Sequence, residues 1–485
     1  MAQVVSLHVG QCGNQVGHET YEVLAREALA SCEGRGMSGF AESVLSTHFA
    51  VGDERERGSG RAVVPRARAI MIDAEPRVVQ SNLVKAGRSD VWRYRAGAHI
   101  AGESGSGNNW AHGYLEHGPR LADDVTEELR REVEKCDCVT GVVVMHSLGG
   151  GTGSGLGTHI TELAREMYPK VHILNQVVWP FASGDVVVQD YNTCLSLSHL
   201  LDASDAVLVS QNSDVLEMCK RGLNMGRPGL HEINGAVARD LAACLMPSSH
   251  RGPGGPSAPP AASPHQQGGA RRQKEEDTWT VEETEEAVRA LTPARPVADL
   301  VRALCSHPWY KILGCKTLPQ VPHESRKFST HRWRPVVSSF VRMQGSGQYV
   351  EEFAVADAWA RRSVGSLLTL RGCGSHAVDV SALRDPRLYP PWLASEMDAG
   401  TPLAGLTVTC SPHGSLASAV SASLVSNDGC ICPCLDRTLA KASGMLHQAA
   451  YVHQYTQRGL EKEQLSACLA RLEQTLSDYQ ALNQA

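Results

Sequence analysis

The sequence lacks any apolar run that approaches the roughly 20 residues needed to cross a bilayer, so no membrane-inserted segment is expected. Its first residues, MAQVVSLHVG, lack the basic start and the long apolar stretch of a secretory signal. The net charge of -6 gives no basic footprint for nucleic acid. What is present is an ordinary globular composition, with 42% hydrophobic and 20% charged residues over 485 positions. We therefore expect a cytosolic or nuclear protein of several domains.

The 15 cysteines lack the paired spacing of a zinc site. They are scattered along the chain, and their one cluster is CICPC, from Cys430 to Cys434. A structural zinc site usually combines two CxxC pairs, or one such pair with histidines, and no second pair lies nearby. The spacing therefore favours a plain thiol-rich segment of free cysteines over a metal site.

The order of the predicted elements indicates an α/β fold. Buried strands alternate with helical stretches over residues 1–246, which predicts a Rossmann-like domain with a largely parallel sheet. Within it, residues 30–61 are rich in Gly, Ser and charge, and we expect a loop there. Residues 247–295 are rich in Pro, Gly, Ser and Ala without apolar periodicity, and are predicted to be a flexible insert and linker. An intermediate α+β domain (296–433) and a C-terminal helical region (434–485) are expected to follow.

Apolar side chains recur at helical spacing near the C-terminus. They are Leu465, Cys468, Leu469, Leu472, Leu476 and Tyr479. A helix with this pattern packs either on its own domain or against a partner protein. The sequence favours packing on its own domain and leaves the partner-binding face as the alternative.

The clearest functional signal is a run of glycines, SLGGGTGSGLG at residues 147–157. It follows the predicted strand VVVMH and precedes the predicted helix THITELAREMY. In this arrangement main-chain N–H groups and the helix dipole bind an anion, because glycine lets the backbone approach a phosphate closely. Thr152 and Ser154 could add hydroxyl donors. No lysine follows the glycines, so this is not a P-loop, and the GxGxxG turn of a dinucleotide-dependent oxidoreductase is absent because Leu156 takes its last position.

Three further segments are expected at the same edge of the sheet. VGQCGNQVG follows the first predicted strand, and a helix is expected from about Asn14. Asp73 and Glu75 follow another strand, and their carboxylates are the hard oxygen ligands that Mg²⁺ prefers. GSGNNWAHG, residues 105–113, adds side-chain amides. Because the carboxyl ends of parallel strands share one crevice, both glycine turns are expected to face one nucleotide.

Taken in order, these motifs resemble the nucleotide motifs of the tubulin family. They are GQCGNQ at 10–15, DAEP at 73–76, GSGNNWA at 105–111 and GGGTGSG at 149–155. The resemblance covers nearly the whole chain apart from residues 247–295, and stretches such as NNWAHGYLEHGPR and YVHQYTQRGLEKE are most similar to the delta class. It implies a tubulin-like fold, with a GTP-binding domain followed by an α+β domain and C-terminal helices. It also implies GTP or GDP and Mg²⁺ as cofactors.

The resemblance assigns the nucleotide contacts residue by residue. Those expected to bind GTP are Gly10, Gln11, Cys12, Asn108, Gly149, Gly150, Gly151, Thr152, Gly153, Ser154, Gly155, Asn212 and Asn234. Of these, the last two asparagines would read the guanine edge, since an amide pairs with both a donor and an acceptor. Asp73 and Glu75 would approach the Mg²⁺ and the γ-phosphate. Gln189 stands where tubulins usually have a ribose-contacting glutamate, and Leu230 stands where an aromatic residue usually stacks on guanine.

Tubulins hydrolyse GTP where two subunits meet, and the resemblance implies a similar arrangement here. An acidic residue of one subunit helps to activate water at the γ-phosphate of the next. The segment PVADLVRALCSHPWYKIL resembles the one that carries this acid, and it places Asp299 at the catalytic position. The alternative is a solvated helix aspartate, and whether GTP is hydrolysed at all stays open.

The resemblance finally implies a cellular role. A delta-class tubulin would support the triplet microtubules of centrioles and basal bodies, and hence cilia or flagella. Its partners would be other tubulins (epsilon, alpha and beta) and centriolar proteins, and it would lie in the cytoplasm and cytoskeleton, at the centrosome, basal body and cilium. The alternatives are another divergent tubulin, of epsilon or gamma type, and a scaffold that binds GTP without hydrolysing it.

Overall fold

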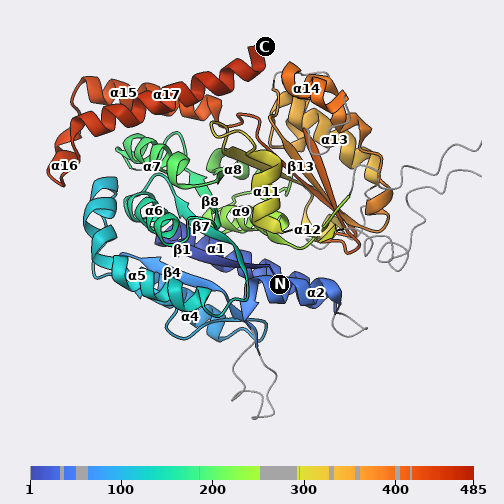
Figure 1. Cartoon of the computed structure of the whole chain (residues 1–485), viewed down its shortest axis with the longest axis horizontal. Coiled ribbons are helices and arrows are strands. Elements are labelled where there is room, and N and C mark those ends of the chain that lie inside the picture. Colours follow the sequence, from blue (N-terminus) through green and yellow to red (C-terminus); the bar gives the residue numbers. More distant parts are fainter. Residues whose placement is uncertain are drawn as a thin grey trace, which may run out of the picture.

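One long mixed sheet runs through the computed structural model, with helices on both of its faces (Figure 1). The structure describes residues 2–32, 38–50, 64–184, 186–251, 292–293, 295–326, 332–355, 361–398, 405–415 and 418–484. Most of the predicted insert, residues 247–295, therefore lies outside the described residues.

The N-terminal half of the sheet is parallel. Its strands in spatial order are β6 (His99–Ala101), β4 (Ala69–Asp73), β1 (Gln3–Val9), β7 (Val139–Ser147), β8 (His172–Trp179) and β9 (Ala206–Gln211). Strands β1 and β4 are buried along their whole length, as strands covered on both faces must be. This parallel sheet with crossover helices confirms the predicted α/β fold.

Successive side chains of β7 show how both faces are covered. Val142 and Val144 pack in one apolar cluster, and Val143 and Met145 pack in another. The first cluster includes α5 (Gly118–Val133) and α6 (Gly157–Met167), and α7 (Gln189–Ala203) lies beside α6. The second includes α9 (Leu230–Leu245) and α11 (Pro296–Leu304), and α1 (Gly10–Ala30) lies beside α9.

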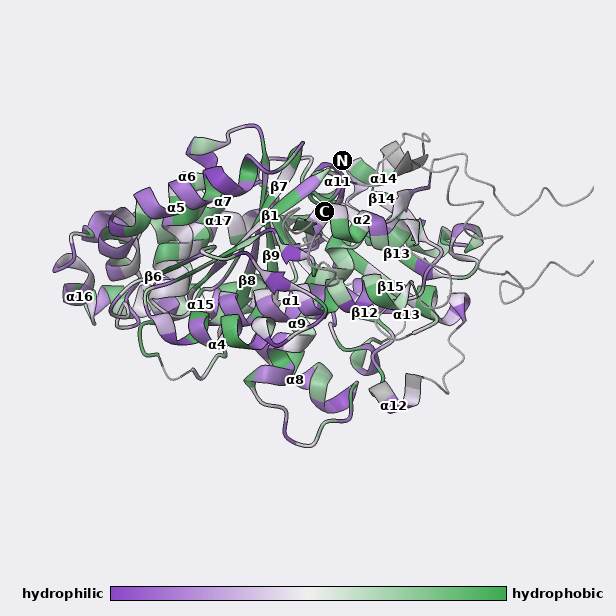
Figure 2. Ribbon diagram, turned by 90° about the horizontal axis from the view of Figure 1, so that it is seen from below, coloured by the Kyte–Doolittle hydropathy of each residue, from purple (hydrophilic) through white to green (hydrophobic). Residues whose placement is uncertain are grey.

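The second half of the sheet is mixed and joins the first through β12 (Ile312–Leu318), which is parallel to β9 and antiparallel to its other neighbour. Beyond it lie β15 (Val420–Ser426), β13 (Ser366–Gly372), β14 (Leu406–Ser411), β10 (Ser249–His250) and β11 (Thr292–Pro293). Helices α13 (Trp333–Ser346) and α14 (Pro391–Asp398) pack on these strands around Trp333, Phe340 and Tyr389 (Figure 2). The short helix α12 (His323–Arg326) follows β12.

Strands β10 and β11 both lie within the predicted insert. Ser249 pairs with Pro293 and His250 pairs with Thr292, both in antiparallel register. The described residues near the two ends of the insert are therefore neighbours in the sheet.

The C-terminal helices α15 (Cys432–His447), α16 (Val452–Thr456) and α17 (Lys462–Gln484) cover α7 (Figure 1). Helix α7 is consequently buried around most of its surface, polar as well as apolar side chains included. The leucines of the helical pattern, with Tyr479, are buried in the same cluster as α7 and α15. The apolar face of this helix is therefore covered within its own chain, by α15 of the C-terminal region and by α7 of the N-terminal half.

The predicted loop at residues 30–61 is wrong in part. Residues Gly39–His48 form helix α2, followed by the short strand β2 (Phe49–Ala50). The Ser38 side chain accepts a hydrogen bond from the Ala41 N–H and caps the helix. Phe40 and Val44 are buried against α1 and α4 (Pro76–Gly87), so tertiary packing stabilises a helix that composition alone did not reveal.

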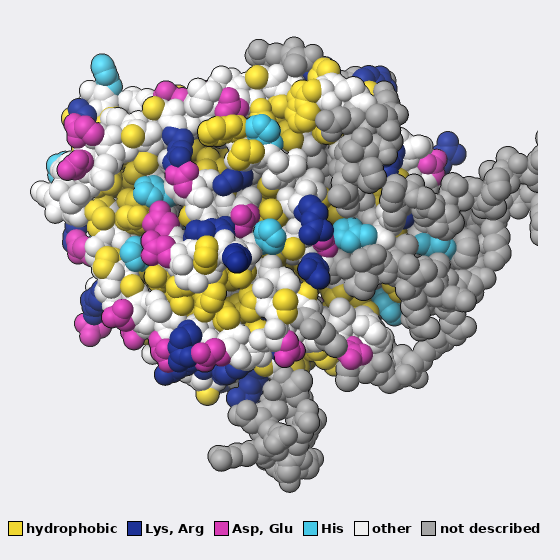
Figure 3. All heavy atoms as spheres, viewed as in Figure 1, with side chains coloured by type: hydrophobic (Ala, Val, Ile, Leu, Met, Phe, Trp, Pro, Cys, Tyr) yellow, Lys and Arg dark blue, Asp and Glu magenta, His cyan; other side chains and the backbone are white. Residues whose placement is uncertain are grey.

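In the part of the chain that the structure describes, no helix combines the length and apolar character needed to cross a bilayer. The face shown in Figure 3 carries acidic and basic side chains close together, without an extended patch of one sign.

Candidate nucleotide site

The two glycine turns meet at the carboxyl ends of β1 and β7. Helix α1 begins at Gly10 itself, which has a φ of 71°, a conformation that favours glycine. A Cβ built on Gly10 would lie only 2.9 Å from the Gly153 main-chain nitrogen. The side chain of Asn14 ties the Gly10 turn to β4, because its Nδ2 donates to the carbonyls of Gly10 (2.9 Å) and Ile72 (3.0 Å). The structure therefore brings together the two turns that the sequence singled out.

The glycine-rich loop also packs on the loop that contains Asn108. A Cβ on Gly151 would lie 2.5 Å from the Asn109 nitrogen, and one on Gly155 would lie 2.2 Å from the Trp110 carbonyl oxygen. The hydroxyls of Ser106 and Thr152 are 3.0 Å apart. These contacts explain the glycines at positions 151 and 155, because a side chain at either position would push the two loops apart.

Gly150 differs from its neighbours in the loop. It is only partly buried, and the nearest atoms to a Cβ built there are the Ser147 Oγ at 3.9 Å and the Asn108 Oδ1 at 4.0 Å. Open space bordered by a hydroxyl, an amide and main-chain N–H groups fits a phosphate. The next hydroxyl, that of Ser154, is buried and donates to the Gly150 carbonyl oxygen, so it holds the loop together and does not face this space.

Asp73 and Glu75 lie at the carboxyl end of β4, next to these loops. Asp73 is buried, which raises the pKa of its carboxyl to about 6, although hydrogen bonds from the main chain of Glu75 and Ala74 lower it in part. Glu75 is exposed, and its Oε1 lies 2.1 Å from a Cβ built on Gly105. Two carboxylates fit a Mg²⁺ ion that takes its other ligands from phosphate oxygens and water.

Gln11 and Cys12 occupy the first turn of α1. The Gln11 side chain is exposed at the site, whereas the Cys12 thiol is largely covered. Burial raises the pKa of that thiol to about 12. Cys12 is therefore neutral at pH 7 and adds no negative charge beside a phosphate.

The two asparagines assigned to the base lie on neighbouring helices. Asn212 begins α8 (Asn212–Arg221), and Asn234 is in the second turn of α9, where its Nδ2 donates to the Gln15 Oε1 at 2.9 Å. Next to them, Val215 and Ile233 share one apolar cluster, against which Cys12 packs. Thus α1, α8 and α9 enclose one corner beside the glycine turns.

Gln189 and Leu230, the two positions that differ from the usual residues of tubulins, have different surroundings. The Nε2 of Gln189 donates to the Phe181 carbonyl oxygen at 2.8 Å, and its Oε1 lies close to Gly184, so the side chain turns into the loop after β8. Leu230 begins α9 and is 60% exposed. This apolar side chain is exposed beside the asparagines assigned to the base, where a planar ligand would cover it.

Sequence reasoning missed two residues that organise the site. Gln15 orients Asn234, and it stands in the GQCGNQ motif, where only the first three residues received a role. Asn192 is fully buried and joins both phosphate loops by hydrogen bonds. Its position in the first turn of α7, three residues after Gln189, was the available signal.

Asp299 lies far from this site in the same chain. Its helix α11 packs at the start of β7, where a Cβ on Gly141 would lie 2.6 Å from Val297, while the glycine loop follows Ser147 at the other end of the strand. Six strand residues separate the two ends, about 20 Å at the usual rise. Burial alone would raise the pKa of Asp299, but hydrogen bonds from His250 (Nε2–Oδ2 2.8 Å) and the Arg295 N–H lower it.

The thiol cluster shows no metal-binding geometry. Burial raises the pKa of Cys432 to about 11 and that of Cys434 to about 12. Throughout the described segments, no group of three or more His, Cys, Asp or Glu side chains is placed to hold a metal ion. All three cysteines of the cluster are free thiols.

Comparison with known proteins agrees with this geometry. Residues 3–220 match the GTPase domain model of the Tubulin/FtsZ family. The tubulin delta chain of Mus musculus is 31% identical over 501 residues, covering 99% of this chain and 99% of the mouse chain. The tubulin delta chain of Homo sapiens is 30% identical over 498 residues, covering 98% and 99%. A tubulin beta chain of Porphyra purpurea is 37% identical over 255 residues but covers only 52% of this chain and 53% of its own.

The likeness to delta chains thus extends through both halves of the sheet and the C-terminal helices, beyond the segment that the GTPase domain model matches. The chain belongs to the tubulin family.

Proposed function

We propose that this protein is a GTP-binding tubulin of the delta type, which supports the triplet microtubules of centrioles and basal bodies and so the assembly of cilia or flagella. Tubulin family proteins bind GTP or GDP, and relatives named tubulin delta chain align over nearly the whole chain. In this proposal its partners are other tubulins, of epsilon, alpha and beta type, and centriolar proteins. It acts in the cytoskeleton, at the centrosome and at the base of the cilium.

The observation that carries the nucleotide part is the contact between the turns at Gly10 and Gly153. In the proposed complex, main-chain N–H groups of both turns bind the phosphates, with Asn108 alongside. Asp73 and Glu75 bind Mg²⁺ with water and phosphate oxygens, and Asn212 and Asn234 read the guanine edge. The adjacent strands β7, β8 and β9 then present phosphate, ribose and base in turn.

The first test is the nucleotide content of the purified protein. We expect about one guanine nucleotide per chain after mild purification at millimolar Mg²⁺, because the site closes on a polyanion with many main-chain donors. Extraction with acid followed by anion-exchange chromatography measures it. Adenine nucleotide in its place, or an empty site that also fails to take up added GTP, would count against the proposal.

Hydrolysis, if it occurs, must involve two chains. The glycine loop and Asp299 lie at opposite ends of β7, so Asp299 of one chain can approach only the nucleotide of another in a head-to-tail contact. Within its own chain, the Asp299 Oδ2 already accepts from His250 and from the Arg295 N–H. Because the Asp299 carboxylate is already hydrogen-bonded within its own chain, a second candidate function is favoured: a scaffold that binds GTP without turnover.

The variant Asp299→Asn separates these two candidates. Asparagine still accepts a hydrogen bond from the Arg295 N–H, but it cannot take a proton from water. If the proposed role is right, GTP turnover in the assembled state falls by about 100-fold or more, while nucleotide content is unchanged. Phosphate release in the presence of tubulin partners gives the rate.

His250→Gln is the matched control, because it removes the imidazole that contacts Asp299 and leaves the Asp299 carboxylate in place. Turnover of this variant should stay close to that of the parent protein. Equal turnover in Asp299→Asn and the parent would remove Asp299 from the mechanism. Absence of turnover in the parent itself would favour the scaffold.

A further inference from the structure

Asn192 makes four hydrogen bonds from a fully buried position. Its Nδ2 donates to the Asn108 carbonyl oxygen at 2.8 Å and to the Gly149 carbonyl oxygen at 3.0 Å. Its Oδ1 accepts from the Trp110 N–H at 2.9 Å and from the Tyr455 hydroxyl at 2.7 Å. The amide thereby uses both donors and both acceptor positions, and its exposed fraction is 0%.

These bonds join the two loops that would cradle the phosphates. Asn108 lies in the loop after β6 and has a φ of 54°, and Gly149 begins the glycine loop. One side chain of α7 therefore fixes the spacing between the loops. Because Asn192 is fully buried, it cannot contact a nucleotide itself, so any effect on binding passes through the loops.

Tyr455 fixes which way the Asn192 amide points. A hydroxyl donor and a main-chain N–H both converge on the Oδ1, which leaves the Nδ2 facing the two carbonyls. Without the hydroxyl, one of the four hydrogen bonds that oppose an amide flip is lost. Tyr455 is itself 1% exposed and comes from α16, 263 residues further along the chain.

The C-terminal segment around α16 makes two more hydrogen bonds, one with the loop that contains Asn108 and one with α7. The Asn109 Nδ2 donates to the Gln454 carbonyl oxygen at 3.2 Å, and the Tyr191 hydroxyl donates to the Ala450 carbonyl oxygen at 3.1 Å. Ala449 and Tyr451 both have positive φ angles, of 51° and 59°, a backbone arrangement that non-glycine residues adopt only when packing holds them there. The segment is thus held in one conformation against the phosphate loops.

We propose that Asn192 is a positioning residue for the phosphate-binding loops, oriented by Tyr455, and that the C-terminal segment 449–456 thereby sets the rate at which nucleotide leaves. This inference rests on the proposed GTP site. In this proposal the C-terminal helical region influences nucleotide binding indirectly, through Tyr455 and Asn192, and not by contact with the nucleotide.

The test compares two buried tyrosines with the full-length protein. Tyr455→Phe removes only the hydroxyl that orients Asn192, whereas Tyr191→Phe removes a hydroxyl bonded to Ala450 in the same packing. The centroids of the two rings are 5.6 Å apart and the rings pack edge to face, so both variants alter the same region of the core. Release of N-methylanthraniloyl-GDP, chased by excess GDP, is followed by stopped-flow fluorescence, and thermal unfolding is measured alongside.

Release from Tyr455→Phe should be about 5-fold faster than from the parent, as expected for one lost buried hydrogen bond. Asn192→Asp, which turns the donor into a second acceptor facing two carbonyls, should be faster still. Tyr191→Phe should lower the unfolding temperature comparably and leave the release rate unchanged. Equal release rates in the two phenylalanine variants would overturn the inference alone, whereas a parent protein that binds no guanine nucleotide would overturn the proposed function with it.

Discussion

Replacing Gly150 by alanine is expected to lower the affinity for GTP about 100-fold, equal to about 2.7 kcal/mol, without unfolding the protein. The nearest protein atoms to the added methyl group are 3.9 and 4.0 Å away, which is ordinary contact distance. The φ of Gly150 lies outside the left-handed region, so alanine adopts the same backbone without strain. The folded structure therefore accommodates this substitution.

The nucleotide would not accommodate it. The methyl would project between the Ser147 hydroxyl and the Asn108 amide, into the space where we place a phosphate. A phosphate displaced from that space loses charge-assisted hydrogen bonds from the backbone, each of about 1.5–3 kcal/mol. Equilibrium titration with N-methylanthraniloyl-GTP measures the affinity, and the unfolding temperature without nucleotide reports the fold.

Gly444→Ala provides the matched control. Gly444 lies within α15, and a Cβ there would meet no atom within 4 Å. Its replacement should leave affinity unchanged and stabilise the helix slightly. If Gly150→Ala binds GTP as tightly as this control, the phosphates do not lie over Gly150, and the placement of the nucleotide is wrong.

The sequence predicted the parts of the site that depend on local order. The glycine turns, Asp73 and the loop at residues 105–111 each follow a strand, and parallel strands end at the same edge of a sheet. Proximity between them then follows from topology. The helix after the first turn was placed too late, at Asn14, because the glycines of the turn also serve as its first residues from Gly10 onward.

The parts that were not predicted depend on contacts between distant segments. Tyr455 reaches Asn192 across 263 residues, and His250 reaches Asp299 across the insert. Neither contact is marked in the sequence by a periodicity or a spacing from which it could be predicted. Helix α2 was missed for a related reason, since its stability comes from Phe40 and Val44 packing on other elements.

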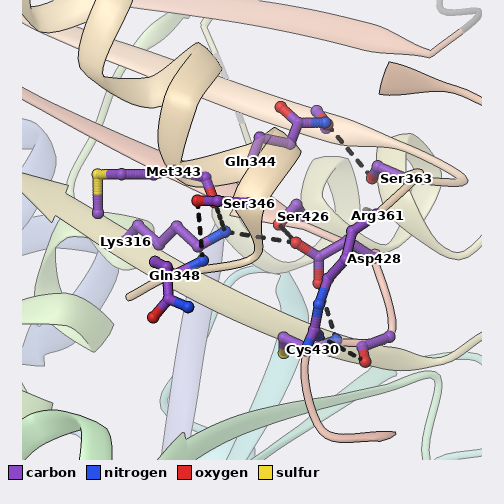
Figure 4. Close-up of polar contacts among 12 residues, drawn as sticks. Lys316, Met343, Gln344, Ser346, Gln348, Arg361, Ser363, Ser426, Asp428 and Cys430 are labelled. Atoms are coloured by element: carbon purple, nitrogen blue, oxygen red, sulfur yellow. Dashed lines mark hydrogen bonds and ion pairs between the residues drawn. The ribbon is translucent and has the colours of Figure 1, made fainter. Parts of the chain in front are cut away.

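The largest loss of stability is expected from Asp428→Ala, about 3–5 kcal/mol in the free energy of unfolding. Asp428 is 1% exposed and Lys316, on β12, is 3% exposed (Figure 4). The Lys316 Nζ lies 3.4 Å from the Asp428 Oδ2 and donates to the Met343 carbonyl oxygen at 3.2 Å. Removal of the carboxylate leaves a buried ammonium group with one neutral acceptor.

The carboxylate is well satisfied in the parent protein. It accepts hydrogen bonds from the Ser426 hydroxyl (2.9 Å) and the Cys430 N–H (3.0 Å). Burial by itself would raise the pKa of Asp428, but the positive charges of Lys316 and Arg361 outweigh it and the pKa is lowered. A lowered folded pKa stabilises the protein above the unfolded value of about 3.9, and this stabilisation is lost as the pH falls through the folded value.

Pairing the substitutions separates charge burial from packing. Asp428→Asn combined with Lys316→Met removes both charges. The amide oxygen keeps an acceptor for the Cys430 N–H, and the amide NH2 faces the Ser426 hydroxyl, which can accept from it. Since a neutral pair carries no unpaired buried charge, the double variant should recover at least half of the stability that Asp428→Ala loses. Urea unfolding at pH 7 measures all three proteins. A double variant less stable than Asp428→Ala would show that the ion pair itself stabilises this region.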